Sequence, residues 1–236
     1  LGNLLRPRFQ QVLDELTGVK KEASMFLCLS EAHLKVGIMC TIGPRRFTGL
    51  LTDFNMRHKG IQLQLVEGVP ARLSELIEQG DIDVALMSTS ESFPERFDVV
   101  PLFRERFMLA FPTGHRLAEY EEIPISAIDG EIYLKRVNCE YWDYLSDLCD
   151  AQGVKTQDSY SSEREDWIQN LVAGGLGICF IPEYSAVVPG LQVRPVTDPK
   201  VTREVCLVTV AGRRFSPAVS AFVKSYGWAV PPSRAA

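Results

Sequence analysis

Residues 37 to 47 read GIMCTIGPRRF, and this stretch marks where one expected element ends and the next begins. The preceding run LKVGIMC (34–40) is short and apolar, as is typical of a buried strand. Pro44 suits the first position of a helix, because the N–H that proline lacks has no intrahelical partner there, and Gly43 is then the expected N-cap. Apolar side chains follow at helical spacing, at Phe47, Leu50, Leu51 and Phe54. The stretch therefore predicts a strand that feeds an amphipathic helix.

Thr41 lies directly after this strand. In open parallel sheets, ligands bind beyond the carboxyl ends of the strands, where unpaired helix N–H groups and the helix dipole favour an anion. We therefore expect Thr41 to contact a ligand. The alternative is that Thr41 only caps its own helix, since threonine is common at such turns.

Strands and helices alternate along most of the chain after residue 34. The first helix, from Pro44, is followed by a strand at 61–66, a helix from Pro70 and a strand at 82–87, which predicts a βαβαβ unit. Two further strands are expected at 97–103 and 106–112. A second α/β unit then follows, with strands at 131–135, near Val154, at 178–181, 191–196 and 204–210, and helices at 141–151, after a Ser162–Glu165 capping box, and at 218–226. Two α/β units built in a similar way predict a cleft between them.

The first thirty residues have a different pattern. Apolar or small residues recur at alternating steps of four and three, at Leu5, Phe9, Val12, Leu16, Val19, Ala23, Phe26 and Ser30. This 3.5-residue period is typical of a helix that pairs with another helix along a narrow seam. We expect residues 1–31 to form a dimerising helix, so that the protein is a homodimer or homotetramer. The alternative is that the seam packs on its own domain.

Composition limits the function classes. The 236 residues are 46% hydrophobic, enough for a core in one domain or two small ones, and the formal net charge of -5 argues against a surface that binds nucleic acid by itself. No apolar run approaches the roughly 20 residues that span a bilayer, and no secretory signal pattern opens the chain. We therefore expect a cytoplasmic protein with no membrane partner.

The cysteines and histidines give little support for a metal site. The six cysteines contain no C-x-x-C pair, and His33, His58 and His115 are far apart in sequence, so neither a metal nor a cofactor is expected. Cys40, Cys179 and Cys206 lie in apolar runs, where a free thiol fills core space.

The ordered set of motifs resembles the effector-binding domain of LysR-type transcriptional regulators. The resemblance rests on the strand-turn-helix of 34–54, on EGVPARLSELIEQGDIDVALM (67–87), on RFMLAFP (106–112) and on WIQNLVAGGLGICFIPE (167–183). The N-terminal seam is similar to the linker helix of that family. In the family a winged helix-turn-helix domain precedes this helix. Leu1 rather than Met opens the chain, so we expect a fragment without its DNA-binding end.

The resemblance implies an α/β fold with two Rossmann-like subdomains, similar to type 2 periplasmic binding proteins. Subdomain I would hold 34–105 plus 205–236, and subdomain II would hold 106–204. A small effector would bind in the cleft between them, and DNA would be bound through the missing N-terminal domain. The protein would regulate transcription and would not be an enzyme; the sequence also has no G-x-S-x-G, Walker or G-x-G-x-x-G motif in the required context.

The same resemblance implies the residues of the effector site: Thr41, Ile42, Ser88, Arg136, Asn138, Cys139 and Ser162. Arg136 is the strong cation of this set, so we expect an anionic or polar effector. Taken alone, Ser88 could be a turn residue, Ser162 a helix cap and Arg136 a solvated surface charge.

Two other functions stay open. Peroxide-sensing members of the family carry a reactive and a resolving cysteine in a similar region, here Cys139 and Cys149. A helix start would lower the pKa of Cys139, but ten residues of intact helix would separate the thiols by roughly 15 Å, so a disulfide would require unwinding. A solute-binding protein would share the two-lobed architecture.

Overall fold

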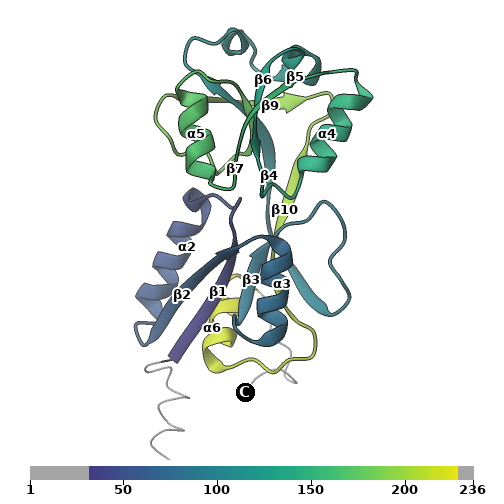
Figure 1. Ribbon diagram of the computed structural model, residues 1–236. Coiled ribbons are helices and arrows are strands. Elements are labelled where there is room, and N and C mark those ends of the chain that lie inside the picture. The colour runs from purple at the N-terminus through teal and green to yellow at the C-terminus, as the bar shows by residue number, and fades with distance from the viewer. Residues whose placement is uncertain (1–31, 228–236) are drawn as a thin grey trace, which may run out of the picture.

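The computed structural model describes residues 32–227, which form two lobes joined by two long strands (Figure 1). The expected linker helix over residues 1–31 lies outside the described part and stays a prediction. Among the described helices the longest has 14 residues, and none is long and apolar enough to cross a bilayer.

The first lobe contains the predicted βαβαβ unit. Its elements are β1 (Ala32–Met39), α2 (Pro44–Arg57), β2 (Ile61–Gly68), α3 (Pro70–Gln79) and β3 (Val84–Met87), with α6 (Pro217–Ser225) added from the end of the chain. β1 pairs in parallel with both β2 and β3. As predicted, Pro44 opens α2 and Gly43 is its N-cap. The α/β character expected from the alternating pattern is confirmed.

Two antiparallel strands connect the lobes: β4 (Phe97–Pro112) and β10 (Thr202–Val210). The sequence predicted two separate strands where β4 is a single one, and that prediction was wrong. The polar residues between the two apolar runs do not interrupt the ladder, because Arg104 and Glu105 pair in register with Glu204 and Arg203 of β10.

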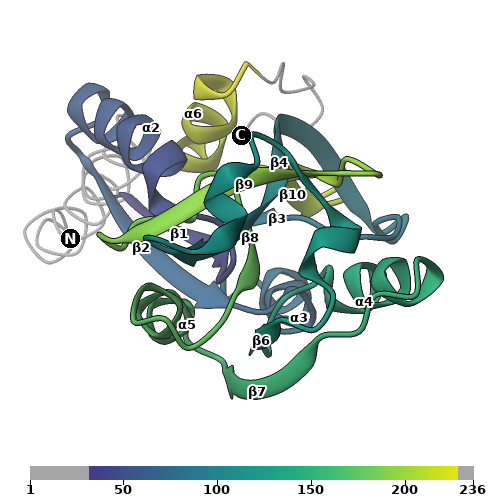
Figure 2. The ribbon, with the colours of Figure 1, turned by 90° about the horizontal axis from the view of Figure 1, so that it is seen from above.

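The second lobe is built on the far end of β4. It contains β5 (Ile123–Pro124), β6 (Ile132–Arg136), α4 (Trp142–Ala151), β7 (Gln157–Ser162), α5 (Glu165–Ala173), β8 (Cys179–Pro182) and β9 (Leu191–Thr197), with short 3-10 helices at Arg116–Glu119 and Ile125–Ile128. β8 and β9 both pair with β4, and β6 pairs with β7. Seen from above in Figure 2, α4 and α5 lie on opposite sides of this lobe.

Two local predictions in the second lobe were wrong. The strand expected near Val154 begins instead at Gln157, and Val154 is a buried residue of the preceding loop. The Ser162–Glu165 capping box does not form: α5 begins at Glu165 with Arg164 as N-cap, and Ser162 Oγ accepts from the Arg164 N–H at 3.1 Å. Ser162 thus stabilises the turn that precedes the helix.

Each lobe has its own apolar core, and the two cores divide along the connecting strands. On β4, Phe103 packs against the first core and Phe107 belongs to the second. On β10, Val205 belongs to the first core and Val201, just before the strand, to the second. Between these positions lie polar residues of both strands, so the junction between the lobes is polar.

Gly43, in the first lobe, lies close to the backbone of the second lobe. A Cβ atom there would be 2.1 Å from the carbonyl oxygen of Tyr184 and 2.6 Å from the Cα of Ser185, both in the segment after β8. The backbone of Gly43 is ordinary extended chain, with φ of -68°, so other residues could adopt it. Glycine is required at position 43 because the backbone of the facing segment leaves no room for a Cβ atom.

We expect Gly43→Ala to lower the free energy of unfolding by about 1–3 kcal/mol, because the added methyl group displaces backbone of the facing segment. Gly49→Ala is the matched control, since a Cβ at this exposed position of α2 has no neighbour within 4 Å. It should stabilise by up to about 1 kcal/mol through helix propensity. Urea denaturation measures both, and equal effects would contradict the close contact.

Candidate functional site

The side chain of Arg203 on β10 lies between the lobes and is completely buried. Its Nε donates to Glu105 Oε1 at 2.9 Å, and Nη2 lies 2.8 Å from the same oxygen. On the other side, Nη1 donates to Thr41 Oγ1 at 2.8 Å and forms an ion pair with Glu140, while Nη2 donates to the Thr41 carbonyl oxygen at 2.8 Å. A charge removed from water needs partners of opposite charge, and this guanidinium has two.

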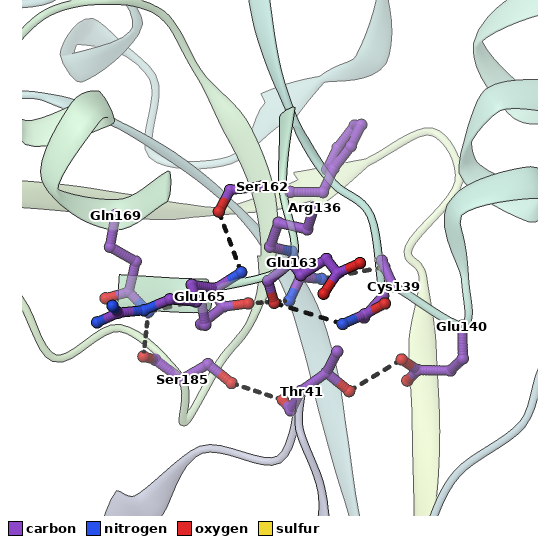
Figure 3. Close-up of polar contacts among 12 residues, drawn as sticks. Thr41, Arg136, Cys139, Glu140, Ser162, Glu163, Glu165, Gln169 and Ser185 are labelled. Carbon is purple, nitrogen blue, oxygen red and sulfur yellow. Dashed lines mark hydrogen bonds and ion pairs between the residues drawn. The ribbon is translucent and has the colours of Figure 1, made fainter. Parts of the chain in front are cut away.

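Thr41 lies at the end of β1, as the sequence predicted, and is buried. Figure 3 shows it between Glu140, whose Oε2 accepts from the Thr41 hydroxyl at 2.9 Å, and Ser185, whose hydroxyl donates to the Thr41 carbonyl oxygen at 3.0 Å. Both partners belong to the second lobe. The polar groups of Thr41 therefore hold the lobes together, and its contact with an effector stays a prediction.

A second set of contacts joins the lobes beside this one. The Tyr141 hydroxyl donates to the carbonyl oxygen of Thr89 at 3.1 Å, and the Ser90 hydroxyl donates to that of Glu140 at 3.4 Å. Ser88, another expected effector residue, is completely buried. Here too, polar groups that follow a strand of the first lobe, β3, form hydrogen bonds to the second lobe.

Among the expected residues of the second lobe, the side chains of Arg136 and Cys139 contact each other (Figure 3). Arg136 is buried, with Nη1 donating to Glu165 Oε2 at 2.8 Å and Nη2 donating to Cys139 Sγ at 3.1 Å. Asn138 Nδ2 donates to the carbonyl oxygen of Glu163 at 3.5 Å. Arg136 is thus neither a solvated surface charge nor a free cation, because a carboxylate of its own lobe neutralises it.

A cavity of about 540 Å³ lies between α2 and β2 of the first lobe and the start of α5 in the second. Of the expected effector residues, Ile42 lines it, whereas Thr41, Ser88, Arg136, Asn138, Cys139 and Ser162 do not. Sequence reasoning missed several lining side chains: Thr48, Leu51, Leu65, Glu67, Glu163 and Val187. The helical spacing of Pro44, Thr48 and Leu51 was a usable signal, because such residues share one face.

Cys40 was expected to fill the core, and this was wrong. Its side chain is half-buried and lines the cavity, whereas Cys179 and Cys206 are buried as predicted. Partial burial, together with the nearby Glu140 carboxylate, raises the pKa of the Cys40 thiol to about 11. The thiol is therefore neutral near pH 7.

Cys139 and Cys149 lie in environments that disfavour the thiolate. α4 begins at Trp142, three residues after Cys139, so Cys139 is not in the first turn of that helix. Burial raises the pKa of the Cys139 thiol, against the lowering effect of Arg136. Burial and the Asp150 carboxylate raise the pKa of Cys149. Cys149 also lines a second cavity, of about 350 Å³, beneath α4.

Among residues 32–227, no three His, Cys, Asp or Glu side chains gather in a way that could hold a metal ion.

Residues 29–227 match the family model described as the LysR substrate binding domain. The chain belongs to this family. Its members are transcriptional regulators rather than enzymes. The family has the mixed α/β, periplasmic-binding-protein-like fold that the sequence predicted.

Similar proteins include a hydrogen peroxide-inducible genes activator and an effector-binding domain solved with a small molecule. The hydrogen peroxide-inducible genes activator of Haemophilus influenzae is 27% identical over 237 residues, which cover 95% of this chain and 78% of the activator. A full-length OxyR variant from Pseudomonas aeruginosa has a TM-score of 0.77 at 24% identity, covering 95% of this chain and 79% of that one. The effector-binding domain of QuiR in complex with shikimate has a TM-score of 0.73 at 20% identity, covering 84% and 96%. At this identity the two structures show the fold alone.

We expect Glu105→Gln to lower the free energy of unfolding by about 3 kcal/mol, because it removes one of the two carboxylates that compensate buried Arg203. Glu204→Gln is the matched control: Glu204 pairs with Arg104 across the same two strands, but Arg104 is 77% exposed. That change should stay within about 0.5 kcal/mol. Denaturation by urea at pH 7 compares the two variants, and a small effect of Glu105→Gln would mean that buried Arg203 does not need the Glu105 carboxylate for its compensation.

Proposed function

We propose that this chain is the ligand-sensing part of a LysR-type transcriptional regulator and binds a small effector in the cavity between its lobes. The observation that carries the proposal is the cavity itself. Its volume of about 540 Å³ lies within the usual range of about 300–1,000 Å³ for small-molecule sites. Both lobes contribute walls, through α2 and β2 on one side and the turn before α5 on the other.

Because the cavity lies between the lobes, a bound ligand would determine how the lobes are arranged. A ligand shifts a conformational equilibrium only if it binds one arrangement better than another. Two walls that belong to different lobes provide that difference, because contacts to both are made only when the lobes are correctly placed. β4 and β10 are the strands about which the lobes would move (Figure 1).

The remaining parts of the regulator are proposed from the family. DNA would be bound through a winged helix-turn-helix domain that the family carries before its linker helix, in the cytoplasm. The seam over residues 1–31 would pair copies of the chain into a homodimer or homotetramer. Family membership favours a regulator over the solute-binding alternative. The complex of QuiR with shikimate supports a small organic effector for a domain of this fold.

The test is ligand binding to the parent and to a variant with a filled cavity. Thr48 is exposed and lines the cavity, so Thr48→Trp should occupy it without entering the core. We expect a thermal-shift screen of carboxylates, phosphates, polyols and amines to find compounds that stabilise the parent. Calorimetry should then show at least tenfold weaker binding to Thr48→Trp, about 1.4 kcal/mol.

The control for this experiment is Ser146→Trp, which places the same bulk at the separate cavity beneath α4. It should leave the affinity unchanged. If no compound stabilises the parent, or if Thr48→Trp binds the hits as well as the parent does, the cavity is not the effector site.

The thiol-switch alternative has one observation in its favour, namely the likeness to the Haemophilus influenzae peroxide-inducible activator. The local chemistry opposes it, since burial raises the pKa of both Cys139 and Cys149 and so reduces the thiolate that reacts with peroxide. The two residues are also separated by most of α4.

We expect both thiols to remain reduced after dilute peroxide, as counted by alkylation under denaturing conditions and mass spectrometry. Cys149→Ser should then give the same fraction of alkylated Cys139 as the parent. A peptide that links Cys139 to Cys149 in the parent would establish the redox switch and overturn this expectation.

A further inference from the structure

We propose that the effector of this cavity is an organic amine, a small molecule with a positively charged group and an apolar body. The inference rests on the proposed function and names the ligand class of the same site. It departs from the anionic or polar effector expected from the sequence, because Arg136, one basis of that expectation, is already paired with Glu165.

The two buried guanidinium groups near the cavity already have partners. Arg136 and Arg203 are both buried, the first paired with Glu165 and the second with Glu105 and Glu140. Each would have to give up a carboxylate of this chain before it could bind an anionic ligand. The guanidinium groups that could bind a ligand anion are thus already paired with carboxylates of the protein itself.

The position expected for an anion is filled by the chain itself. At the end of β1, the Glu140 carboxylate accepts from the Thr41 hydroxyl and pairs with Arg203. This is the contact that a ligand carboxylate would make there. Because Glu140 is held by a fully buried guanidinium, a ligand anion would have to displace it and desolvate its own charge as well.

Two exposed guanidinium groups near the cavity, those of Arg164 and Arg46, also have partners. Arg164 lines the cavity but pairs with Asp166, with Nε donating to Oδ1 at 3.0 Å. Arg46, in the first turn of α2, lies over the rings of Phe103 and Tyr184 at 5.3 and 5.4 Å.

The side chains that do line the cavity are mainly acidic and apolar. Four carboxylates and one guanidinium are among them. Glu67, at the end of β2, and Glu163, before α5, have no hydrogen bond or ion pair through their carboxylates within residues 32–227, and both are exposed. The apolar part of the wall comes from Ile42, Phe47, Leu51, Leu65 and Val187. Leu65 is 48% exposed, so a ligand would cover it.

This arrangement fits an amine with an apolar body. The body would cover the exposed apolar wall, and the ammonium group would lie between Glu67 and Glu163. These carboxylates belong to opposite lobes, so a cation between them reduces their repulsion and favours the arrangement in which the lobes are close. An anion would increase the repulsion. The charge of the ligand thus couples directly to the position of the lobes.

The test compares probes of equal shape and opposite charge on the chain 1–236 at low salt. We would titrate hexylamine and 2-phenylethylamine against hexanoate and 3-phenylpropionate, measuring affinity by NMR shift perturbation. The amines should bind at least tenfold tighter than the matched acids. Glu67→Gln and Glu163→Gln should each weaken amine binding by about fivefold. Glu75→Gln, an exposed carboxylate on α3 away from the cavity, should not.

The outcomes separate this proposal from the proposed function. If the acids bind as well as the amines and Thr48→Trp abolishes their binding, the cavity is the effector site but the ligand class is wrong. If amine binding is unchanged in Thr48→Trp, or in both glutamate variants, the amines bind elsewhere and the proposal is overturned. Failure of every amine to bind overturns it as well.

Discussion

The buried guanidinium of Arg203 constrains how the two lobes meet. A charge without water contact is tolerated only with well-placed partners, and here these come from β4, the end of β1 and the turn before α4. Such a cluster adds little net stability, because the desolvation of both charges offsets most of their attraction. Its effect is geometric: moving the lobes apart would remove Glu140 from Arg203 and leave a buried charge with half of its compensation. The close approach at Gly43 depends on the same alignment, since Glu105 also accepts from the Tyr184 N–H at 3.3 Å.

The junction and the cavity share residues, so a ligand bound in the cavity can affect the junction. Ser185 donates to the Thr41 carbonyl oxygen in the junction and also lines the cavity. Gln169 of α5 donates to the Ser185 carbonyl oxygen at 2.8 Å and accepts from the Val187 N–H at 3.0 Å. The segment from Ser185 to Val187 is therefore fixed to α5, whose first turn forms the second-lobe wall. A ligand that moves α5 would carry this segment with it, and the segment would act on Thr41 and hence on the Arg203 cluster.

The likeness to peroxide-inducible activators does not by itself make this chain a peroxide sensor. The overall identity of 27% is an average over 237 residues, whereas thiol chemistry depends on a few neighbours of each sulfur. Arg136 approaches Cys139 and favours its thiolate, but Glu165 neutralises the guanidinium and burial outweighs its effect. One fold can carry different functions, so function has to be argued from the site.

The sequence by itself determined the elements of the first lobe and the family. Pro44 and the spacing of Phe47, Leu51 and Phe54 located α2, because proline chemistry and helical periodicity are local properties of the chain. The same local rules failed at β4, where a polar pair between two apolar runs is indistinguishable from a loop until its partner strand is known. Only the tertiary structure decided what the expected site residues do. Thr41 and Arg203 are 162 positions apart, and Arg203 and Glu140 are 63 apart. No periodicity relates such positions, so the pairing that neutralises the site and leaves an acidic, apolar cavity beside it arises only when the lobes come together.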